Sequence, residues 1–243
     1  MNLMPKVDVV VPVYNEEKAL PKSIPELRAF LRGGSFPYEW RIVIADNASI
    51  DETPAVSRKL EDEYPGEVTY VRIERKGRGY ALKKTWGEST ADVMSYMDVD
   101  LSTGLEAFPP LIKAIAEEGY GVSTGSRLAP NAQVERSLKR TVLSRGYNLI
   151  IKAMMWTRFS DAQCGFKAIS REVAQRVLPL IQDNNWFFDT ELLVLAEKMG
   201  YKIKDVPVRW VEDPDTRVKI GATVSEDLRG LWRMRRERPW RAG

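Results

Sequence analysis

The segment Met94-Ser95-Tyr96-Met97-Asp98-Val99-Asp100-Leu101-Ser102-Thr103 is the most informative part of this chain. Its apolar first half ends in two carboxylates that are one residue apart. This is typical of a buried strand whose C-terminal tip reaches a site, because a charge left unpaired inside a protein is costly. In an extended chain Asp98 and Asp100 project to the same side, where their oxygens can bind one hard divalent cation. The alternative is an Asp-rich turn after a strand.

Other apolar, β-branched runs lie on both sides of this segment and predict further strands over residues 7–13, 41–45, 68–73 and 120–125. Helices are expected between them, over residues 16–33, 53–64, 80–89 and 105–118. Thr53 is the expected N-cap of the second helix, with Pro54 at its first position. Strands that alternate with helices predict an α/β fold with a mostly parallel central sheet flanked by helices. Ligands of such sheets bind beyond the carboxyl ends of the strands, so the loops there should line one crevice.

The regular alternation ends after Arg127. Beyond it we expect one or two helices over residues 137–156, a loop over 161–167, helices over 171–180 and 186–200, a strand over 203–210 and a final helix over 224–236. We expect one catalytic domain over residues 1–218, followed by a basic amphipathic C-terminal helix and tail over 219–243.

The composition restricts the chemistry. The 243 residues include no histidine and a single cysteine, Cys164, so a Ser-His-Asp triad, a Cys-His dyad, a histidine-ligated metal and an internal disulfide are all excluded. Catalysis must therefore rely on carboxylates, cations and a hard metal ion. The net charge of +3 is too small to indicate nucleic acid as a partner. No apolar run is long enough to cross a bilayer, and the first residues lack the pattern of a signal peptide.

Four stretches together resemble one enzyme family: residues 9–16, 46–53, 77–82 and 98–100. They are similar to the inverting family 2 glycosyltransferases, which have the GT-A fold, and the resemblance covers roughly residues 6–218. Residues 161–167, 186–191 and the strand containing Trp210 resemble the branch that transfers one hexose to a polyprenyl or dolichyl phosphate. Within that branch they are closer to the phosphoglucose synthases than to the phosphomannose synthases.

The resemblance implies a donor site for a nucleoside diphosphate sugar of the UDP-glucose or GDP-mannose class. Asp98 and Asp100 then become the expected ligands of Mg²⁺ or Mn²⁺, which would bridge the two phosphates of the donor. The implied donor-binding residues are Pro12, Tyr14, Glu16, Asp46, Asp51, Arg78 and Asp98. Asp46 and Asp51 could instead be only loop and capping residues, and Arg78 only a solvated loop cation. Because Asn47 stands where many relatives have an acidic residue, the choice of base stays open.

The acceptor side follows from chemistry as well as from the resemblance. A phosphate monoester already carries a nucleophilic oxygen, so it needs cations to hold it more than it needs a general base. The resemblance implies that Arg127, Arg140, Ser144 and Arg217 bind this phosphate, and the spacing of Arg140 and Ser144 puts both on one helix face. The alternatives are an ordinary basic helix face and, for Arg217, a surface loop.

Three acidic residues are expected near the transferred sugar: Asp161, which matches an acidic position of the family, and the pair Asp189 and Glu191. The alternative for this pair is capping of the helix that begins there. The residues expected to act in catalysis are Asp100, Asp161, Arg127 and Arg140. A rival interpretation is a glycosyltransferase with a sugar or other hydroxyl acceptor, for which Asp161 would be the base. A rival of another class is a sugar-nucleotide binding protein without turnover.

The C-terminal segment has its own pattern. Residues 229–243 contain six arginines and one glutamate, and Leu228, Leu231, Trp232 and Arg235 follow helical spacing. A basic amphipathic helix with tryptophan suits the headgroup region of an anionic membrane, and residues 149–156 offer a second contact patch. With the resemblance, this predicts peripheral binding to the cytoplasmic face of a membrane. The alternative is a helix packed on the sheet with its arginines extended to solvent. The sequence does not indicate an oligomeric state.

Overall fold

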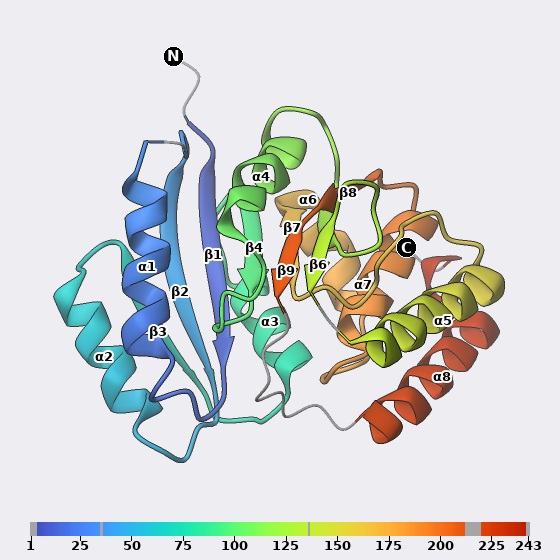
Figure 1. Ribbon diagram of the computed structural model, residues 1–243, viewed down its shortest axis with the longest axis horizontal. Coiled ribbons are helices and arrows are strands. Elements are labelled where there is room, and N and C mark those ends of the chain that lie inside the picture. Colours follow the sequence, from blue (N-terminus) through green and yellow to red (C-terminus); the bar gives the residue numbers. More distant parts are fainter. Residues whose placement is uncertain (1–3, 35, 136, 212–219, 242–243) are drawn as a thin grey trace.

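The computed structural model describes residues 4–34, 36–135, 137–211 and 220–241, and within them it has an α/β architecture (Figure 1). A seven-stranded central sheet has the strand order β3-β2-β1-β4-β7-β5-β8. Its strands are β1 (Lys6–Val13), β2 (Glu39–Asn47), β3 (Val68–Ile73), β4 (Val93–Met97), β5 (Val122–Ser126), β7 (Phe166–Ser170) and β8 (Ile203–Pro207). The short strands β6 (Gln133–Glu135) and β9 (Arg209–Val211) pair in a second sheet.

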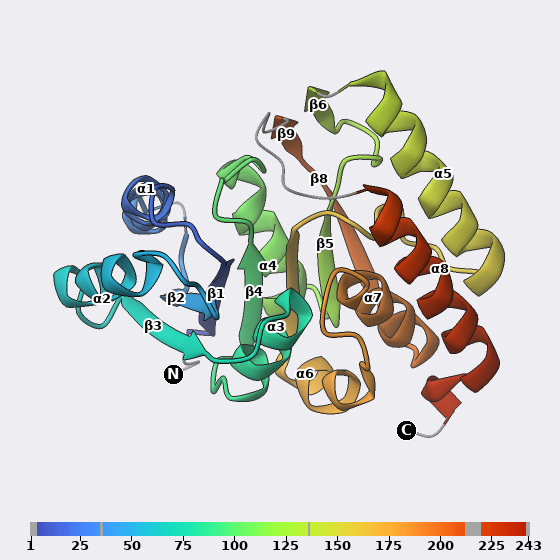
Figure 2. The same cartoon turned by 90° about the horizontal axis from the view of Figure 1, so that it is seen from below.

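Helices cover both faces of the sheet (Figure 2). The first face carries α1 (Leu20–Arg32), α2 (Thr53–Glu63) and α4 (Phe108–Ala116), the last preceded by the short 3-10 helix η1 (Leu105–Ala107). The second face carries α3 (Arg78–Gly87), α5 (Leu138–Met155), α6 (Arg171–Val177) with η2 (Leu178–Leu180), α7 (Phe188–Lys198) and α8 (Ile220–Glu237), which η3 (Pro239–Arg241) follows. Each face has its own buried apolar cluster, so the sheet is covered on both sides.

The expected mostly parallel sheet is confirmed, with one strand that the sequence did not predict. β1 runs parallel to β2 and β4, β2 to β3, and β5 to β8, whereas β7 is antiparallel to both β4 and β5. Residues 166 and 167, predicted to be in a loop, begin β7. The predicted strand over 203–210 is also divided, since its second half leaves the central sheet as β9 and pairs with β6. The helix expected as one or two over 137–156 is a single helix.

Two local predictions are wrong in detail. The chain is not extended through Asp100, because β4 ends at Met97 and a turn follows in which the Leu101 amide donates to the Asp98 carbonyl at 3.2 Å. Thr53 is not the N-cap of α2, which is Glu52. The Thr53 hydroxyl instead accepts a hydrogen bond from the Glu16 amide at 2.8 Å, and this bond joins the loops that follow β1 and β2.

The C-terminal helix is part of the second core. Leu231 and Met234 of α8 are fully buried in the cluster that also contains Ile151 of α5, and α5 and α8 lie side by side in both views (Figures 1 and 2). Apolar packing thus joins residues 220–241 to the sheet, while the predicted boundary at residue 218 falls outside the described residues. None of the helices described is both long and apolar enough to cross a membrane.

Candidate active site

The loops that follow β1 and β2 are tied together by hydrogen bonds. The Asn15 amide donates to Ser49 Oγ at 2.9 Å, and the Ile50 amide donates to Asn15 Oδ1 at 3.0 Å. The ring of Tyr14, one residue earlier, receives Lys76 Nζ at 3.7 Å from its centroid, which links in the loop after β3. Pro12 lies within β1, partly buried. The strand-end loops expected to line one crevice therefore do meet at one edge of the sheet.

Asp46 and Asp51 stabilise these loops. Asp46 is fully buried, and its oxygens accept hydrogen bonds from the Ser49 amide at 2.9 Å, the Tyr70 hydroxyl at 2.9 Å and Arg72 Nη1 at 2.7 Å. Burial alone would raise the pKa of Asp46, but these donors outweigh it and lower the pKa. Asp51 accepts from the Thr53 amide at 3.0 Å. Both carboxylates therefore hold the loop that follows β2 in place.

Asn47 connects the same edge to the start of α3. Its Oδ1 accepts a hydrogen bond from the Gly77 amide at 2.7 Å. Gly77 has a φ of 147°, a conformation that a residue with a Cβ rarely adopts, and an added Cβ would lie 2.5 Å from the Asn184 carbonyl oxygen. This amide therefore contributes to the placement of the next residue, Arg78.

The two carboxylates after β4 are differently exposed. The side chain of Asp98 is 43% exposed and forms an ion pair with Arg78 Nη2. Burial raises the pKa of Asp98, and the Arg78 guanidinium opposes this shift. Asp100 is exposed, and its Oδ1 accepts from the Ser102 amide at 2.9 Å.

These two residues fit a divalent metal that is completed by its substrate. Among the described residues, no group of three or more acidic, cysteine or histidine side chains gathers as a protein-only metal site. Mg²⁺ usually takes one or two carboxylates and fills its remaining positions with water and substrate phosphate oxygens. Asp98 and Asp100 would supply hard oxygen ligands of this kind, from a turn rather than from the extended strand that the sequence predicted.

Behind Asp98 lies a buried cluster of charges that the sequence only partly predicted. Asp189 is 4% exposed, and its oxygens lie 3.3 Å from Arg78 Nη1 and 3.1 Å from Lys167 Nζ. The Tyr96 hydroxyl donates to the same carboxylate. Lys167 is fully buried in β7 and was not among the predicted site residues. Its only sequence cue is a charged residue within the apolar run 166–169.

A second buried ion pair joins Arg127, directly after β5, to Asp161, in the segment between α5 and β7. Arg127 Nε and Nη2 donate to the two oxygens of Asp161 at 2.7 and 3.0 Å, and the backbone amides of Arg127 and Gln163 donate to them at 3.2 and 3.1 Å. Asp161 has no exposed surface. Burial opposes its ionisation, but Arg127 prevails and lowers the pKa of Asp161. The guanidinium of Arg127 also lies 5.5 Å from the ring centroid of Trp210.

The remaining predicted acceptor residues are only partly described. Ser144 lies on α5 and is 8% exposed, and its Oγ has no hydrogen-bond partner among the described residues. Arg140 lies in the first turns of the same helix, but its side chain is outside the described part of the structure. Arg217 also falls outside the described residues.

The helix α8 contributes two buried polar contacts that sequence reasoning missed. Glu191 is fully buried and accepts from Arg233 Nη2 of α8 at 2.7 Å and from the Asp183 amide at 2.9 Å. Asp227 of α8 is 2% exposed and accepts from Gln163 Nε2 at 3.3 Å. Burial raises the pKa of Asp227 to about 6. Both contacts reach segments that hold predicted site residues.

Comparison with curated proteins gives relatives along nearly the whole chain. The chain is 32% identical over 237 residues to the glycosyltransferase AglD of Haloferax volcanii. This alignment covers 94% of this chain and 37% of AglD. The chain is 30% identical to the dolichyl-phosphate beta-glucosyltransferase ALG5A of Trichomonas vaginalis (90% of this chain, 69% of that protein) and 30% identical to the dolichyl-phosphate beta-glucosyltransferase of Drosophila melanogaster (85% and 67%). The chain thus spans about a third of AglD and about two thirds of the other two.

Solved structures agree on the fold. A UDP complex of glucosyl-3-phosphoglycerate synthase from Mycobacterium tuberculosis superposes with a TM-score of 0.72 at 19% identity, covering 95% of this chain and 80% of that one. A mannosyltransferase from Pyrobaculum calidifontis, in complex with GDP-Man and Mn²⁺, gives 0.58 at 21% identity, covering 97% and 61%. The expected GT-A-like α/β fold is confirmed. The family model described as Glycosyl transferase family 2 matches residues 8–178, so the chain belongs to this family of glycosyltransferases.

Proposed function

We propose that this protein transfers one hexose from a nucleoside diphosphate sugar to a polyprenyl phosphate, with inversion and with Mg²⁺ or Mn²⁺. The observation that carries the proposal is the ion pair of Arg127 and Asp161. It offers a buried guanidinium for an anionic acceptor and occupies the carboxylate that a hydroxyl acceptor would need as its base. The names of the dolichyl-phosphate beta-glucosyltransferase relatives support the same acceptor class.

The state of Asp161 argues against general-base catalysis. A general base must have a free oxygen and a pKa near the operating pH. The oxygens of Asp161 accept four N–H hydrogen bonds, and Arg127 lowers its pKa. A lipid phosphate, whose second pKa is about 6, is largely a dianion at neutral pH and needs no base. One of its oxygens forms the new bond to the anomeric carbon while the bond from that carbon to the nucleoside diphosphate breaks.

The acceptor phosphate then requires cations. Arg127 and Arg140 are the proposed cations. The Ser144 hydroxyl, which has no hydrogen-bond partner within the described part of the chain, is a further proposed hydrogen-bond donor, and Arg217 is a fourth proposed residue. Arginine suits this role because its planar fork matches phosphate oxygens. Two cations held against a negatively charged donor place the attacking oxygen close to the anomeric carbon.

We place the nucleotide-sugar donor at the same edge of the sheet, beside the loops that follow β1, β2 and β3. Tyr14, Glu16 and Pro12, with the loops held by Asp46 and Asp51, would surround the base and ribose, and Arg78 would contact the diphosphate. Asp98 and Asp100 would hold the metal ion, which when bound offsets the negative charge of the departing diphosphate. Asp161 would lie near the sugar together with Asp189 and Glu191. Both nucleotides seen with the structural relatives, UDP and GDP-Man, are kept as candidate donor types.

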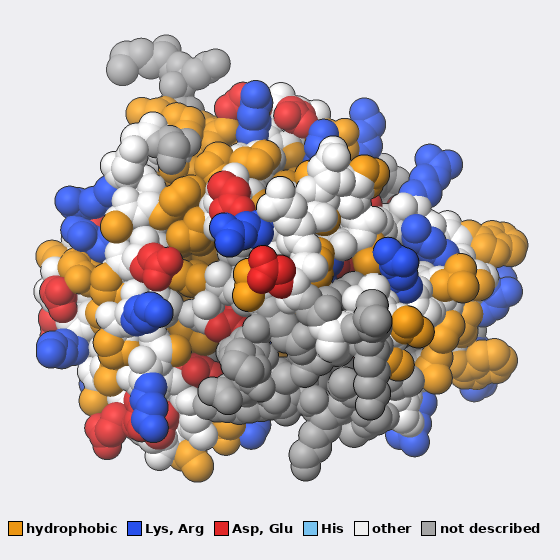
Figure 3. Space-filling model, in the orientation of Figure 1, with side chains coloured by type: hydrophobic (Ala, Val, Ile, Leu, Met, Phe, Trp, Pro, Cys, Tyr) orange, Lys and Arg blue, Asp and Glu red, His pale blue; other side chains and the backbone are white. Residues whose placement is uncertain are grey.

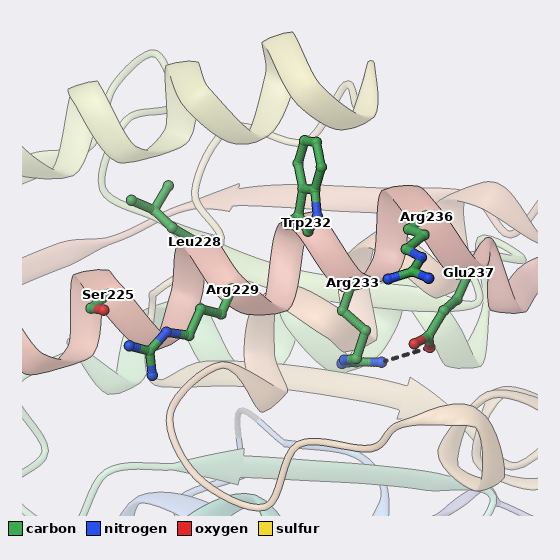
Figure 4. A pocket seen from close by; sticks show the side chains of 7 residues that line it. All are labelled: Ser225, Leu228, Arg229, Trp232, Arg233, Arg236 and Glu237. Carbon is green, nitrogen blue, oxygen red and sulfur yellow. Dashed lines mark ion pairs between the residues drawn. The ribbon is translucent and has the colours of Figure 1, made fainter.

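We also propose that the protein docks on the cytoplasmic face of a membrane through α5 and α8. Hydrophobic side chains and cations gather over these helices (Figure 3). The exposed apolar residues here include Leu149 of α5, Trp156 directly after it, and Leu228 and Trp232 of α8. An open groove of about 600 Å³ runs along α8. The side chains of Leu228 and Trp232 project from α8 toward α5 (Figure 4). Its lining residues are Ser225, Leu228, Arg229, Trp232, Arg233, Arg236 and Glu237. Each arginine at an anionic surface contributes about 1 kcal/mol of binding.

The docking proposal is tested by flotation with phosphatidylserine and phosphatidylcholine vesicles. We expect binding to the anionic vesicles, which falls when Trp232 and Arg229 are both replaced by alanine. Equal binding by the double variant and the wild type would remove α8 from the contact surface.

The transfer itself is tested with radiolabelled UDP-glucose and GDP-mannose in turn, polyprenyl phosphate, and Mg²⁺ or Mn²⁺. We expect label to enter the organic phase with one donor, only with metal, and not with the Asp100→Ala variant. Consumption of donor without labelled lipid would favour a hydroxyl acceptor or hydrolysis. Nucleotide binding without any turnover would support the non-catalytic alternative.

A further inference from the structure

The guanidinium of Arg78 lies between two carboxylates that differ in their access to solvent. The side chain of Asp98 is 43% exposed, whereas that of Asp189 is 6% exposed. Arg78 itself is 14% exposed and contacts both, with Nη2 on Asp98 and Nη1 on Asp189. Its guanidinium also lies 4.9 Å from the ring centroid of Trp186. The outer partner can therefore be exchanged for a ligand more easily than the inner one.

Asp189 is fixed in place by groups that do not reach solvent. Lys167 Nζ lies 3.1 Å from its Oδ1 and donates to the carbonyls of Ala162 and Cys164 at 3.1 and 2.6 Å. The buried Tyr96 hydroxyl donates to the same carboxylate. Moving Asp189 away would leave a fully buried ammonium without its carboxylate, which is strongly unfavourable.

The backbone around Arg78 is also docked onto the segment that leads into α7. The Tyr80 amide donates to the Asn184 carbonyl at 3.0 Å. A Cβ added to Gly79 would lie 2.6 Å from Phe188 Cβ, so only glycine allows this approach. The start of α3 and the start of α7 thus form one unit, in which Asp189 is placed to direct the Arg78 side chain.

We propose that Asp189, held by Lys167 and Tyr96, is a positioning residue that keeps Arg78 at the nucleotide site. Arg78 leaves Asp98 for the diphosphate of the donor and keeps its contact with Asp189. This inference rests on the proposed function and deepens it, because it gives Asp189 a role through the diphosphate rather than through the sugar. An arginine has five N–H donors, so one face can bind phosphate oxygens while the other stays on a carboxylate.

The first test measures binding of UDP and of GDP, each with Mn²⁺, by isothermal titration calorimetry. For the nucleotide that binds, we expect Asp189→Asn to weaken the affinity about 10-fold, although neither probe carries a sugar. The matched control is Asp8→Asn. Asp8 is equally buried and paired with Arg41 near the start of β1, away from the site, so its replacement should leave affinity unchanged.

The second test is a double-mutant cycle with Arg78→Ala. If Asp189 acts through Arg78, then Arg78→Ala/Asp189→Asn should bind the nucleotide as weakly as Arg78→Ala alone. If Asp189 contacts the sugar directly, Asp189→Asn should weaken binding of the nucleotide sugar but not of the free nucleotide. That second result would overturn the inference.

Loss of folding is controlled by a charge-balanced variant. Lys167→Met/Asp189→Asn removes the buried ammonium together with its partner, so we expect its melting temperature to exceed that of Asp189→Asn. Its nucleotide affinity should stay about 10-fold below wild type, and a return to wild-type affinity would overturn the positioning role. If the wild type binds neither UDP nor GDP, the proposed function fails and this inference fails with it. Wild-type binding that Asp189→Asn leaves unchanged overturns this inference alone.

Discussion

Replacing Asp161 with asparagine tests the buried ion pair most severely. Asp161 has no exposed surface, and all four of its hydrogen-bond donors are N–H groups. In Asp161→Asn, one oxygen becomes an NH₂ group that faces these donors, and Arg127, 12% exposed, is left without its carboxylate. Breaking a buried ion pair by removing one partner costs about 3–5 kcal/mol. For a chain of this length, that corresponds to a melting temperature about 6–20 °C lower.

The assay is equilibrium urea unfolding followed by circular dichroism. Because Arg127 lowers the pKa of Asp161 in the folded protein, the stabilisation is fully present above the unfolded pKa of about 3.9 and is lost as pH falls through the folded value. We therefore expect the full difference between wild type and Asp161→Asn at pH 7 and a smaller one under strongly acidic conditions. The control is Asp92→Asn, which removes an ion pair with Arg171 at the surface and should cost less than about 1 kcal/mol. An Asp161→Asn variant within 1 kcal/mol of wild type at pH 7 would refute the reasoning.

Three further changes probe other parts of the molecule. Burial raises the pKa of Asp227 to about 6, above the value of about 4 in an unfolded chain, so folding takes up a proton between about pH 4 and pH 6. The stability falls as pH rises through this window, and ionised Asp227 is destabilising above it. Asp227→Asn should therefore be more stable than wild type at pH 8, by up to about 3 kcal/mol in urea unfolding, with no such gain at pH 4; an equal difference at both pH values would contradict this. In Gly165→Ala the new Cβ would lie 1.8 Å from Asp98 Oδ2, so Asp98 must move, and we expect weaker Mn²⁺-dependent nucleotide binding in calorimetry; unchanged binding would exclude Asp98 from the metal site. Leu231→Ala should lower the free energy of unfolding by about 2–5 kcal/mol because Leu231 is fully buried, while Trp232→Ala, at a position 66% exposed, should change it by less than about 1 kcal/mol. Similar losses in these two variants would mean that α8 is not packed as described.

Much of the fold could be predicted from the sequence because parallel strands buried on both faces require continuous apolar runs. β3 has the predicted bounds, and β1, β2 and β5 lie within two residues of the prediction at each end, whereas β4 ends three residues before Asp100. Asp98 was recognised as a candidate site residue because it follows such a run directly, whereas Arg127 was implied by the family resemblance. A charge at that position lies at the edge of the sheet, where solvent or a ligand can reach it.

β7 was missed because Lys167 interrupts its apolar pattern. A fully buried lysine is rare unless it is paired, and its partner, Asp189, lies on a different element that local sequence cannot place beside it. The pair of Arg78 and Asp189 shows the same limit, since 111 positions separate the two residues. Pairing across such a sequence separation depends on the tertiary fold, which patterns of three or four residues do not indicate.

The C-terminal helix illustrates another limit. Its helical spacing predicted an amphipathic helix, and α8 is one, but a periodic pattern shows that an apolar stripe exists without showing what covers it. In the structure the stripe is divided. Leu231 and Met234 pack into the core of the domain, whereas Leu228 and Trp232 stay exposed beside α5. The packed-helix interpretation therefore holds for Leu231 and Met234, and membrane contact through Leu228 and Trp232 stays a proposal.

The central claim is that the acceptor is a phosphate and needs no general base. The most direct measurement compares transfer to polyprenyl phosphate with transfer to the free alcohol, polyprenol, under identical conditions with the same donor and metal. We predict labelled product with the phosphate and none above background with the alcohol, together with loss of product in Arg127→Met. Comparable transfer to polyprenol would contradict the account, because it would require a base that the occupied carboxylate of Asp161 does not offer.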